Sequence, residues 1–102
     1  MHGIALTLLS AHLPHANYSD NEYEAALLCL ESLVHQARVS NRKVLVGIDA
    51  NAVLGRQCVH DSTKVIGKWG LNDRNERGVI FAAWLHLNLL TASNTMFQKS
   101  CW

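Results

Sequence analysis

The sequence has little proline, almost no net charge and no long hydrophobic run. One proline among 102 residues, of which 49% are hydrophobic, excludes a disordered tail and suits a packed α/β unit. No apolar run approaches the about 18 residues of a membrane span, and the first residues lack the pattern of a signal peptide. We therefore expect one domain or part of one, in an intracellular protein, nuclear or cytoplasmic, with no membrane partner.

The cysteines are few and widely spaced, which excludes two common kinds of stabilising site. Cys29, Cys58 and Cys101 are odd in number and form neither a disulfide framework nor a CxxC metal site. Cys29 lies in a helical pattern and is expected to be a small core residue. The formal charge of +1 argues neither for nor against a nucleic-acid partner. Basic residues gather between residues 52 and 78, and a solvated loop is the simpler explanation for them.

Two short apolar runs predict strands. Residues 3–11 predict a central strand buried on both faces, which ends before Pro14 because proline lacks a backbone donor. His12 and His15 then lie at the strand end or in the following loop. They are not expected to bind zinc, because proline separates them and no third ligand follows at a suitable spacing. Residues 44–48 predict a second buried strand, which delivers Asp49 and Asn51 to the rim of the sheet.

A stretch between the two expected strands predicts a helix. Ser19 and Glu22 form a capping box, so a helix should begin at about Asp20. Its exposed or boundary residues should include His35. The expected apolar face consists of Tyr23, Ala26, Leu27, Leu30, Leu33, Val34 and Ala37.

The second half of the chain predicts a long loop, a helix and a strand. Residues 52–75 contain no regular pattern, and Trp69 in this loop either anchors it or stacks on a base. Asn75 is expected to cap a helix with an exposed His86, and residues 88–93 are expected to form a third strand. The expected buried face of this helix consists of Val79, Ile80, Ala83, Trp84 and Leu87.

Asp49 and Asn51 allow two interpretations. If both lie on a strand, they share a face and can act together on a phosphate, a metal or a water molecule. Alternatively Asp49, Asn51 and Gly55 form a turn, since these are ordinary turn residues.

The order and spacing of several motifs resemble a known superfamily. The chain is similar to the central part of the endonuclease/exonuclease/phosphatase superfamily, and within it to the apurinic-type endonuclease domains of LINE-type retrotransposons and derived host proteins. Each motif alone is weak, and their order over nearly the whole chain carries the resemblance. The motifs are a strand with His12-Leu13-Pro14, a helix, Val44-Leu-Val-Gly-x-Asp49-x-Asn51, Gly67-x-x-Gly70, residues 74–78 with a second helix, and Asn94-Thr95-x-Phe97.

The resemblance implies a partial four-layer α/β/β/α sandwich of the DNase I-like kind, ordered strand-helix-strand-loop-helix-strand. It implies Mg²⁺-dependent cleavage of a phosphodiester such as DNA, in which Asp49 orients or deprotonates water and Asn51 holds the scissile phosphate. His12 would stabilise the transition state or protonate the leaving oxygen, unless it is a structural histidine. Arg74 and Arg77 would contact the DNA backbone, although Arg77 could equally pair with Glu76 or cap a neighbouring loop.

Two parts of the family pattern have no counterpart here, namely the metal-binding Glu and the Ser-Asp-His end with the catalytic base. Residues 1–102 are therefore expected to be the central fragment of one such domain. Asp49 alone is a poor Mg²⁺ site, so inactivity of the isolated chain is expected. Open sheet edges would favour self-association. The alternatives are a non-catalytic protein-binding module on the same fold and a lipid- or sugar-phosphate phosphatase of the same superfamily.

Overall fold

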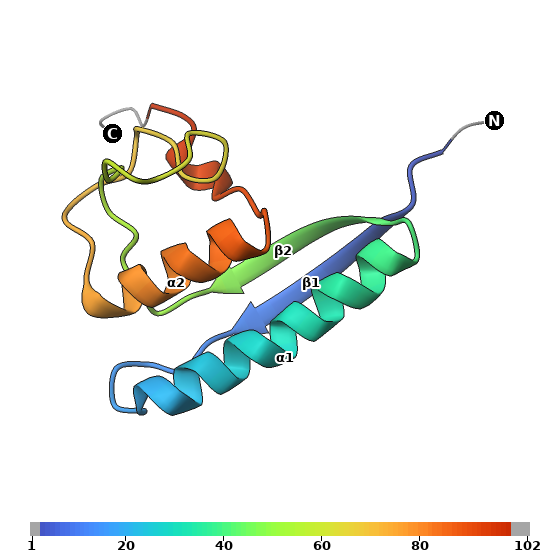
Figure 1. The fold of residues 1–102 in the computed structure, drawn as a ribbon, viewed down its shortest axis with the longest axis horizontal. Helices are drawn as coiled ribbons and strands as arrows, with labels where there is room; N and C mark the ends of the chain where they lie inside the picture. Colours follow the sequence, from blue (N-terminus) through green and yellow to red (C-terminus); the bar gives the residue numbers. More distant parts are fainter. Residues whose placement is uncertain (1–2, 99–102) are drawn as a thin grey trace. The chain divides into compact units, whose positions relative to one another are not determined.

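The computed structural model describes residues 3–98, and the chain divides into two compact units, Met1–Asn51 and Ala52–Trp102. The first unit contains β1 (Leu6–His12), α1 (Asp20–Val39) and β2 (Lys43–Asp49). The second unit contains α2 (Glu76–Leu87) and a 3-10 helix, η1 (Ser93–Thr95). Figure 1 shows these elements along the chain. Neither described helix is both long enough and apolar enough to span a membrane.

The first unit is an α/β crossover in which β1 and β2 are parallel neighbours. Residues pair directly along the whole length, from Leu6 opposite Lys43 to His12 opposite Asp49. Arg42 holds the beginning of this register, because its side chain donates to Thr7 Oγ1 at 2.7 Å and to the Leu6 carbonyl at 2.8 Å. The two strands therefore end side by side, which places their terminal side chains together.

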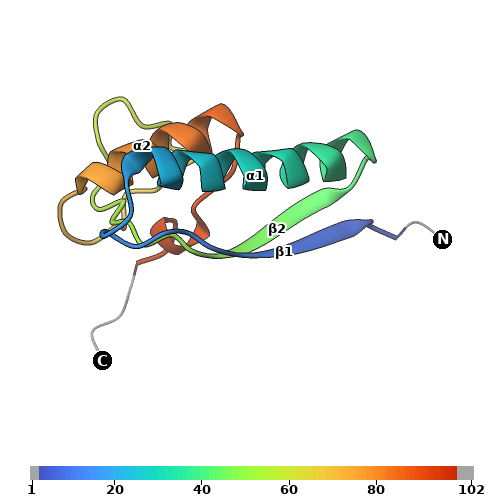
Figure 2. The same cartoon turned by 90° about the horizontal axis from the view of Figure 1, so that it is seen from below.

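Helix α1 covers one face of this strand pair, as Figure 2 shows. The predicted burial of β1 on both faces and the predicted buried state of β2 are both wrong, because exposed and half-buried residues alternate along each strand. Leu8 is 68% exposed and Leu45 is 59% exposed. β1 also begins three residues later than expected and includes His12 as its last residue. An apolar run indicates a strand, but it does not indicate how many layers cover it.

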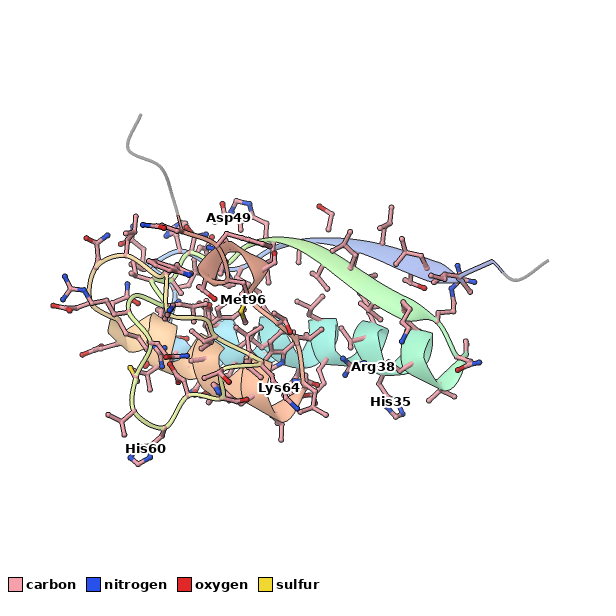
Figure 3. The ribbon with its side chains drawn as sticks, turned by 90° about the horizontal axis from the view of Figure 1, so that it is seen from above. His35, Arg38, Asp49, His60, Lys64 and Met96 are labelled. Atoms are coloured by element: carbon pink, nitrogen blue, oxygen red, sulfur yellow. The ribbon has the colours of Figure 1, made fainter. Side chains whose placement is uncertain are left out.

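Helix α1 begins where the capping box predicted. The Glu22 amide donates to Ser19 Oγ, and the Ser19 amide donates to Glu22 Oε2, each at 3.2 Å. Leu33 and Cys29 are exposed, so their expected burial is wrong; the stripe that meets a two-stranded sheet is narrower than the apolar pattern. His35 is exposed as expected, and Figure 3 shows it pointing away from the strands. The buried face is formed by Tyr23, Leu27, Leu30, Val34 and Ala37.

Helix α2 is capped by Asn75 as predicted, with its side chain accepting from the Gly78 amide at 2.8 Å. The expected buried face is largely wrong, since Val79 and Leu87 are 59% and 76% exposed. Nearly every position from 79 to 87 is apolar, so the periodicity did not single out one face. The helix instead buries Arg77, Gly78, Phe81, Ala82, Trp84 and Leu85.

The expected third strand is absent from the described part of the chain. Within residues 88–93, Ala92 forms an isolated parallel bridge with Ile66, and η1 follows at once. Leu89 has a positive φ of 52°, which interrupts an extended conformation. Cys29 and Cys58 are free thiols, and Cys101 lies outside the described residues.

Candidate functional site

The candidate site lies at the carboxyl ends of β1 and β2. The register places His12 opposite Asp49, and His12 Nδ1 lies 3.7 Å from Asp49 Oδ2. Both side chains are open to solvent, with exposed fractions of 75% and 59%. Figure 3 shows Asp49 at the end of β2, on the side of the strands away from α1. An imidazole and a carboxylate therefore face solvent together at the end of a parallel strand pair.

Asn51 joins these two residues through a turn rather than through a shared strand face. β2 ends at Asp49, and Asn51 has a positive φ of 47°, a conformation that asparagine tolerates well. The Asn51 amide donates to Asp49 Oδ1 at 3.3 Å, which forms an Asx turn. The expectation that Asp49 and Asn51 lie on one strand face is therefore wrong, and the turn interpretation is confirmed for these two residues. Gly55, the third residue of that interpretation, is buried in the other unit.

The Asn51 side chain bridges the two strand ends. Its Nδ2 donates to the Leu13 carbonyl at 2.7 Å and lies 3.5 Å from His12 Nε2. A carboxamide has two N–H donors, so one serves Leu13 and the second remains for the imidazole or for a ligand. The turn and the strand ends therefore use one carboxylate oxygen of Asp49 and one side-chain N–H of Asn51. The other carboxylate oxygen and the other N–H remain beside His12.

Buried groups directly behind this edge hold it in place. The fully buried Tyr23 of α1 donates its hydroxyl hydrogen to the Ala50 carbonyl at 2.8 Å. The Leu13 amide donates to the Asp49 carbonyl at 2.8 Å, and Leu13 is 2% exposed. The sequence marked Tyr23 only as a core residue. The presence of a tyrosine rather than a phenylalanine at a buried position was the available signal that its hydroxyl has a partner.

The residues of this edge do not form a magnesium site by themselves. Mg²⁺ takes near-octahedral oxygen ligation, whereas the site offers one carboxylate, one amide and one imidazole. Residues 3–98 contain no group of three or more His, Cys, Asp or Glu side chains arranged to hold a metal. What the arrangement offers chemically is a proton acceptor at Asp49, a neutral donor at Asn51 and an imidazole at His12.

Arg74 belongs to a buried ion pair in the second unit. Its guanidinium contacts both carboxylate oxygens of Asp61, at 3.1 and 2.6 Å, and its Nε donates to the Leu54 carbonyl at 2.6 Å. The two side chains are 11% and 6% exposed. Arg77, the other expected DNA contact, is 9% exposed. The geometry of Arg74 is therefore that of a structural residue.

The carboxylate of Asp61 organises the irregular segment before α2. It also accepts from the Cys58 amide at 2.8 Å, and it lies 4.0 Å from His86 Nε2. Burial raises the pKa of Asp61, but hydrogen bonds from Arg74 and Cys58 and the positive charge of Arg74 outweigh this effect and lower the pKa below its usual value. The hydrogen bond to Asp61 raises the pKa of Arg74 despite its burial. No sequence pattern indicated this pair, because its members are 13 residues apart in a segment without periodicity.

His86 is part of the same cluster, so its expected exposure is wrong. His86 Nδ1 lies 2.7 Å from the Ala82 carbonyl, and its Nε2 accepts from the Ser62 amide at 2.9 Å. Trp69 is half-buried, its amide donates to the Thr95 carbonyl at 3.0 Å, and the Lys68 ammonium lies 5.0 Å from its ring centroid. These contacts favour anchoring as the role of Trp69.

The geometry thus brings together three of the five expected site residues, His12, Asp49 and Asn51, and gives Arg74 a structural partner. Comparison of the chain with protein-family models, with curated proteins and with solved structures finds no match.

Proposed function

We propose that the carboxyl edge of β1 and β2 is the phosphodiester-binding centre of a hydrolase of the endonuclease/exonuclease/phosphatase type. In this proposal the first unit corresponds to part of one sheet and one helical layer of the four-layer α/β/β/α sandwich, and the phosphodiester is that of DNA. The observation that carries the proposal is the placement of Asn51 Nδ2 3.5 Å from His12 Nε2 while Asp49 faces the same imidazole.

Each of the three residues has a role that its chemistry supports. The Asn51 amide donates to a phosphate oxygen without adding charge, and His12 offers a second donor when protonated. Asp49 takes a proton from the attacking water as the new P–O bond forms. The old P–O bond then breaks, and its oxygen takes a proton from the His12 imidazolium. All three groups lie at the end of a strand pair, where parallel sheets commonly bind ligands.

Binding of a fluorescently labelled DNA oligonucleotide, measured by anisotropy, tests this role of Asn51. Asn51→Asp is expected to weaken binding about tenfold, because it replaces a neutral donor with a like charge beside the phosphate. The matched control is Asn41→Asp. Asn41 is exposed, also has a positive φ of 59°, and precedes β2 rather than following it. The same charge change there should leave the affinity within about twofold.

Asp49→Asn is expected to change affinity in the opposite direction. The Asp49 carboxylate repels a phosphate that approaches His12 and Asn51, so the neutral variant should bind the oligonucleotide several times more tightly. If Asn51→Asp and Asn41→Asp weaken binding equally, only the net charge matters, and the proposed site is wrong.

Cleavage by the chain alone is expected to be absent. The edge supplies too few oxygen ligands for Mg²⁺, and a base without its metal and orienting partners loses most of its rate advantage. In a plasmid-nicking assay with Mg²⁺, the wild-type chain should nick no faster than its Asp49→Ala variant. Robust nicking that Asp49→Ala abolishes would show that the site is complete.

A further inference from the structure

The face of the strand pair away from α1 has a regular pattern of size and charge. Every second register pair is exposed along it, four pairs in all, and each pair combines one residue of β1 with its register partner in β2. The pairs at the two ends differ in charge, with Lys43 at one end and Asp49 at the other. Of the two central pairs, one has two large side chains and the other has two small residues. In order, the pairs are Leu6 with Lys43, Leu8 with Leu45, Ser10 with Gly47, and His12 with Asp49.

From this pattern we infer that the exposed face of β1 and β2 is a docking surface for a second copy of this chain. Rotation by 180° about an axis that lies between the two sheets, perpendicular to the strands, reverses the order of the pairs on the facing copy. Lys43 then faces Asp49 of the second copy, and Leu45 faces its Gly47. On β1, Leu8 faces Ser10 in the same way.

This arrangement is complementary in both charge and shape. It forms the same Lys43–Asp49 contact twice, as a two-fold interface requires. It also places each large leucine against a small residue, which is how facing sheets interdigitate. Parallel sheets are almost always covered on both faces, whereas Leu8 and Leu45 are 68% and 59% exposed.

The size of the face sets the expected strength of association. Seven-residue strands span about 20 Å, and two strands with their side chains are about 10 Å wide. Such a face is smaller than the about 800 Å² per partner of a standard stable complex, so the dimer is weak, with a Kd of about 0.1 mM. The inference uses only the register and the exposure of these residues, and it does not rest on the proposed function. Because the interface covers His12 and Asp49, self-association and phosphodiester binding at this edge would compete.

Charge exchange at Lys43 and Asp49 tests the inference by sedimentation analysis between about 10 μM and about 1 mM chain, a range chosen around the expected Kd. Lys43→Glu and Asp49→Lys should each weaken self-association about tenfold, because each faces like charges across the interface. Mixing the two variants should restore association, since the carboxylate introduced by Lys43→Glu then faces the ammonium introduced by Asp49→Lys, and the other contact remains native. Residues 43 and 49 lie about 20 Å apart within one strand, so this restoration cannot arise within one chain.

Leu28→Glu is the matched control, because Leu28 is 64% exposed on α1 and lies outside the proposed face. It should leave association unchanged, and circular dichroism of every variant should match that of the wild type. The inference is overturned if the wild-type chain stays monomeric up to about 1 mM. It is also overturned if the mixture of charge variants fails to associate, or if Leu28→Glu weakens association as much as they do.

Discussion

Replacing Asp61 with asparagine is expected to lower the free energy of unfolding by about 3 kcal/mol. The carboxylate is 6% exposed and contacts the Arg74 guanidinium through both oxygens. Asparagine has nearly the same shape but no charge, so the variant leaves the partly buried Arg74 guanidinium without its counter-ion. Removing one partner of a buried ion pair is strongly destabilising because the charge that remains is not compensated. Chemical denaturation followed by circular dichroism measures the change.

The control for this prediction is Asp73→Asn in the same unit. Asp73 pairs with Arg56 at 3.5 Å, but the two side chains are 94% and 75% exposed. Exposed pairs contribute little, so this variant should change stability by less than about 0.5 kcal/mol. Equal effects of the two substitutions would show that Asp61 is no more important than a surface charge.

The same pair gives stability a defined dependence on pH. Because the pKa of Asp61 is lowered in the folded protein, its contribution is fully present above the usual aspartate pKa and is lost as the pH falls through the lower folded value. The difference in unfolding free energy between the wild type and Asp61→Asn should therefore shrink in acid. A difference that stays constant down to strongly acidic pH would contradict the assigned direction of the pKa shift.

Gly78→Ala is expected to destabilise the protein by about 2 kcal/mol, although alanine is the better helix former. Gly78 is buried in the first turn of α2, and a Cβ atom there would collide with the Val53 carbonyl oxygen. The Asn75 side chain fixes both partners, since it accepts from the amides of Val53 and Gly78 at 3.1 and 2.8 Å. Neither the helix nor the loop can move away easily. Thermal unfolding measures the effect.

Gly47→Ala is the matched glycine substitution. A Cβ at this position in β2 has the Leu9 carbonyl oxygen as its nearest neighbour, at 4.0 Å, which is ordinary contact. Its backbone is extended, so alanine should be neutral or slightly stabilising, within about 0.5 kcal/mol. If Gly78→Ala is equally well tolerated, the approach of the Val53 carbonyl to α2 is looser than in the structure.

Features set by local signals could be predicted from the sequence. The capping box of Ser19 and Glu22 and the cap at Asn75 depend on residues within one helical turn, and both helices begin where predicted. The order of strand, helix and strand was also predictable, as was the end of β2 at Asp49, where an apolar run meets a polar turn residue. Each of these signals acts over a few residues, so tertiary packing did not override it.

Features set by distant contacts could not be predicted. The face that α2 buries depends on which residues pack against it, and its sequence is apolar nearly all round. Residues 88–93 have the composition of a strand, yet only Ala92 finds a bridge partner there. The pairing of Asp61 with Arg74 joins two residues within an irregular segment, for which no periodicity exists.

The candidate site was partly predictable for the same reason. Asp49 and Asn51 were identified from their place after an apolar run, whereas a role for His12 was expected only from the family resemblance. The turn at Asp49 and Asn51 was one of the two interpretations that the sequence allowed, but the approach of the Asn51 side chain to His12 was not expected, because it depends on the pairing of two strands that are far apart in the sequence. Parallel pairing in direct register then places the two strand ends together.

The most direct test of the proposed site is an NMR titration of the isotopically labelled chain with a short DNA oligonucleotide. The account predicts that the largest saturable shifts occur at His12, Leu13 and Asn51, and that Asn51→Asp raises the Kd measured from them about tenfold. Largest shifts in the basic segment 52–78, with Asn51→Asp binding as tightly as the wild type, would contradict it.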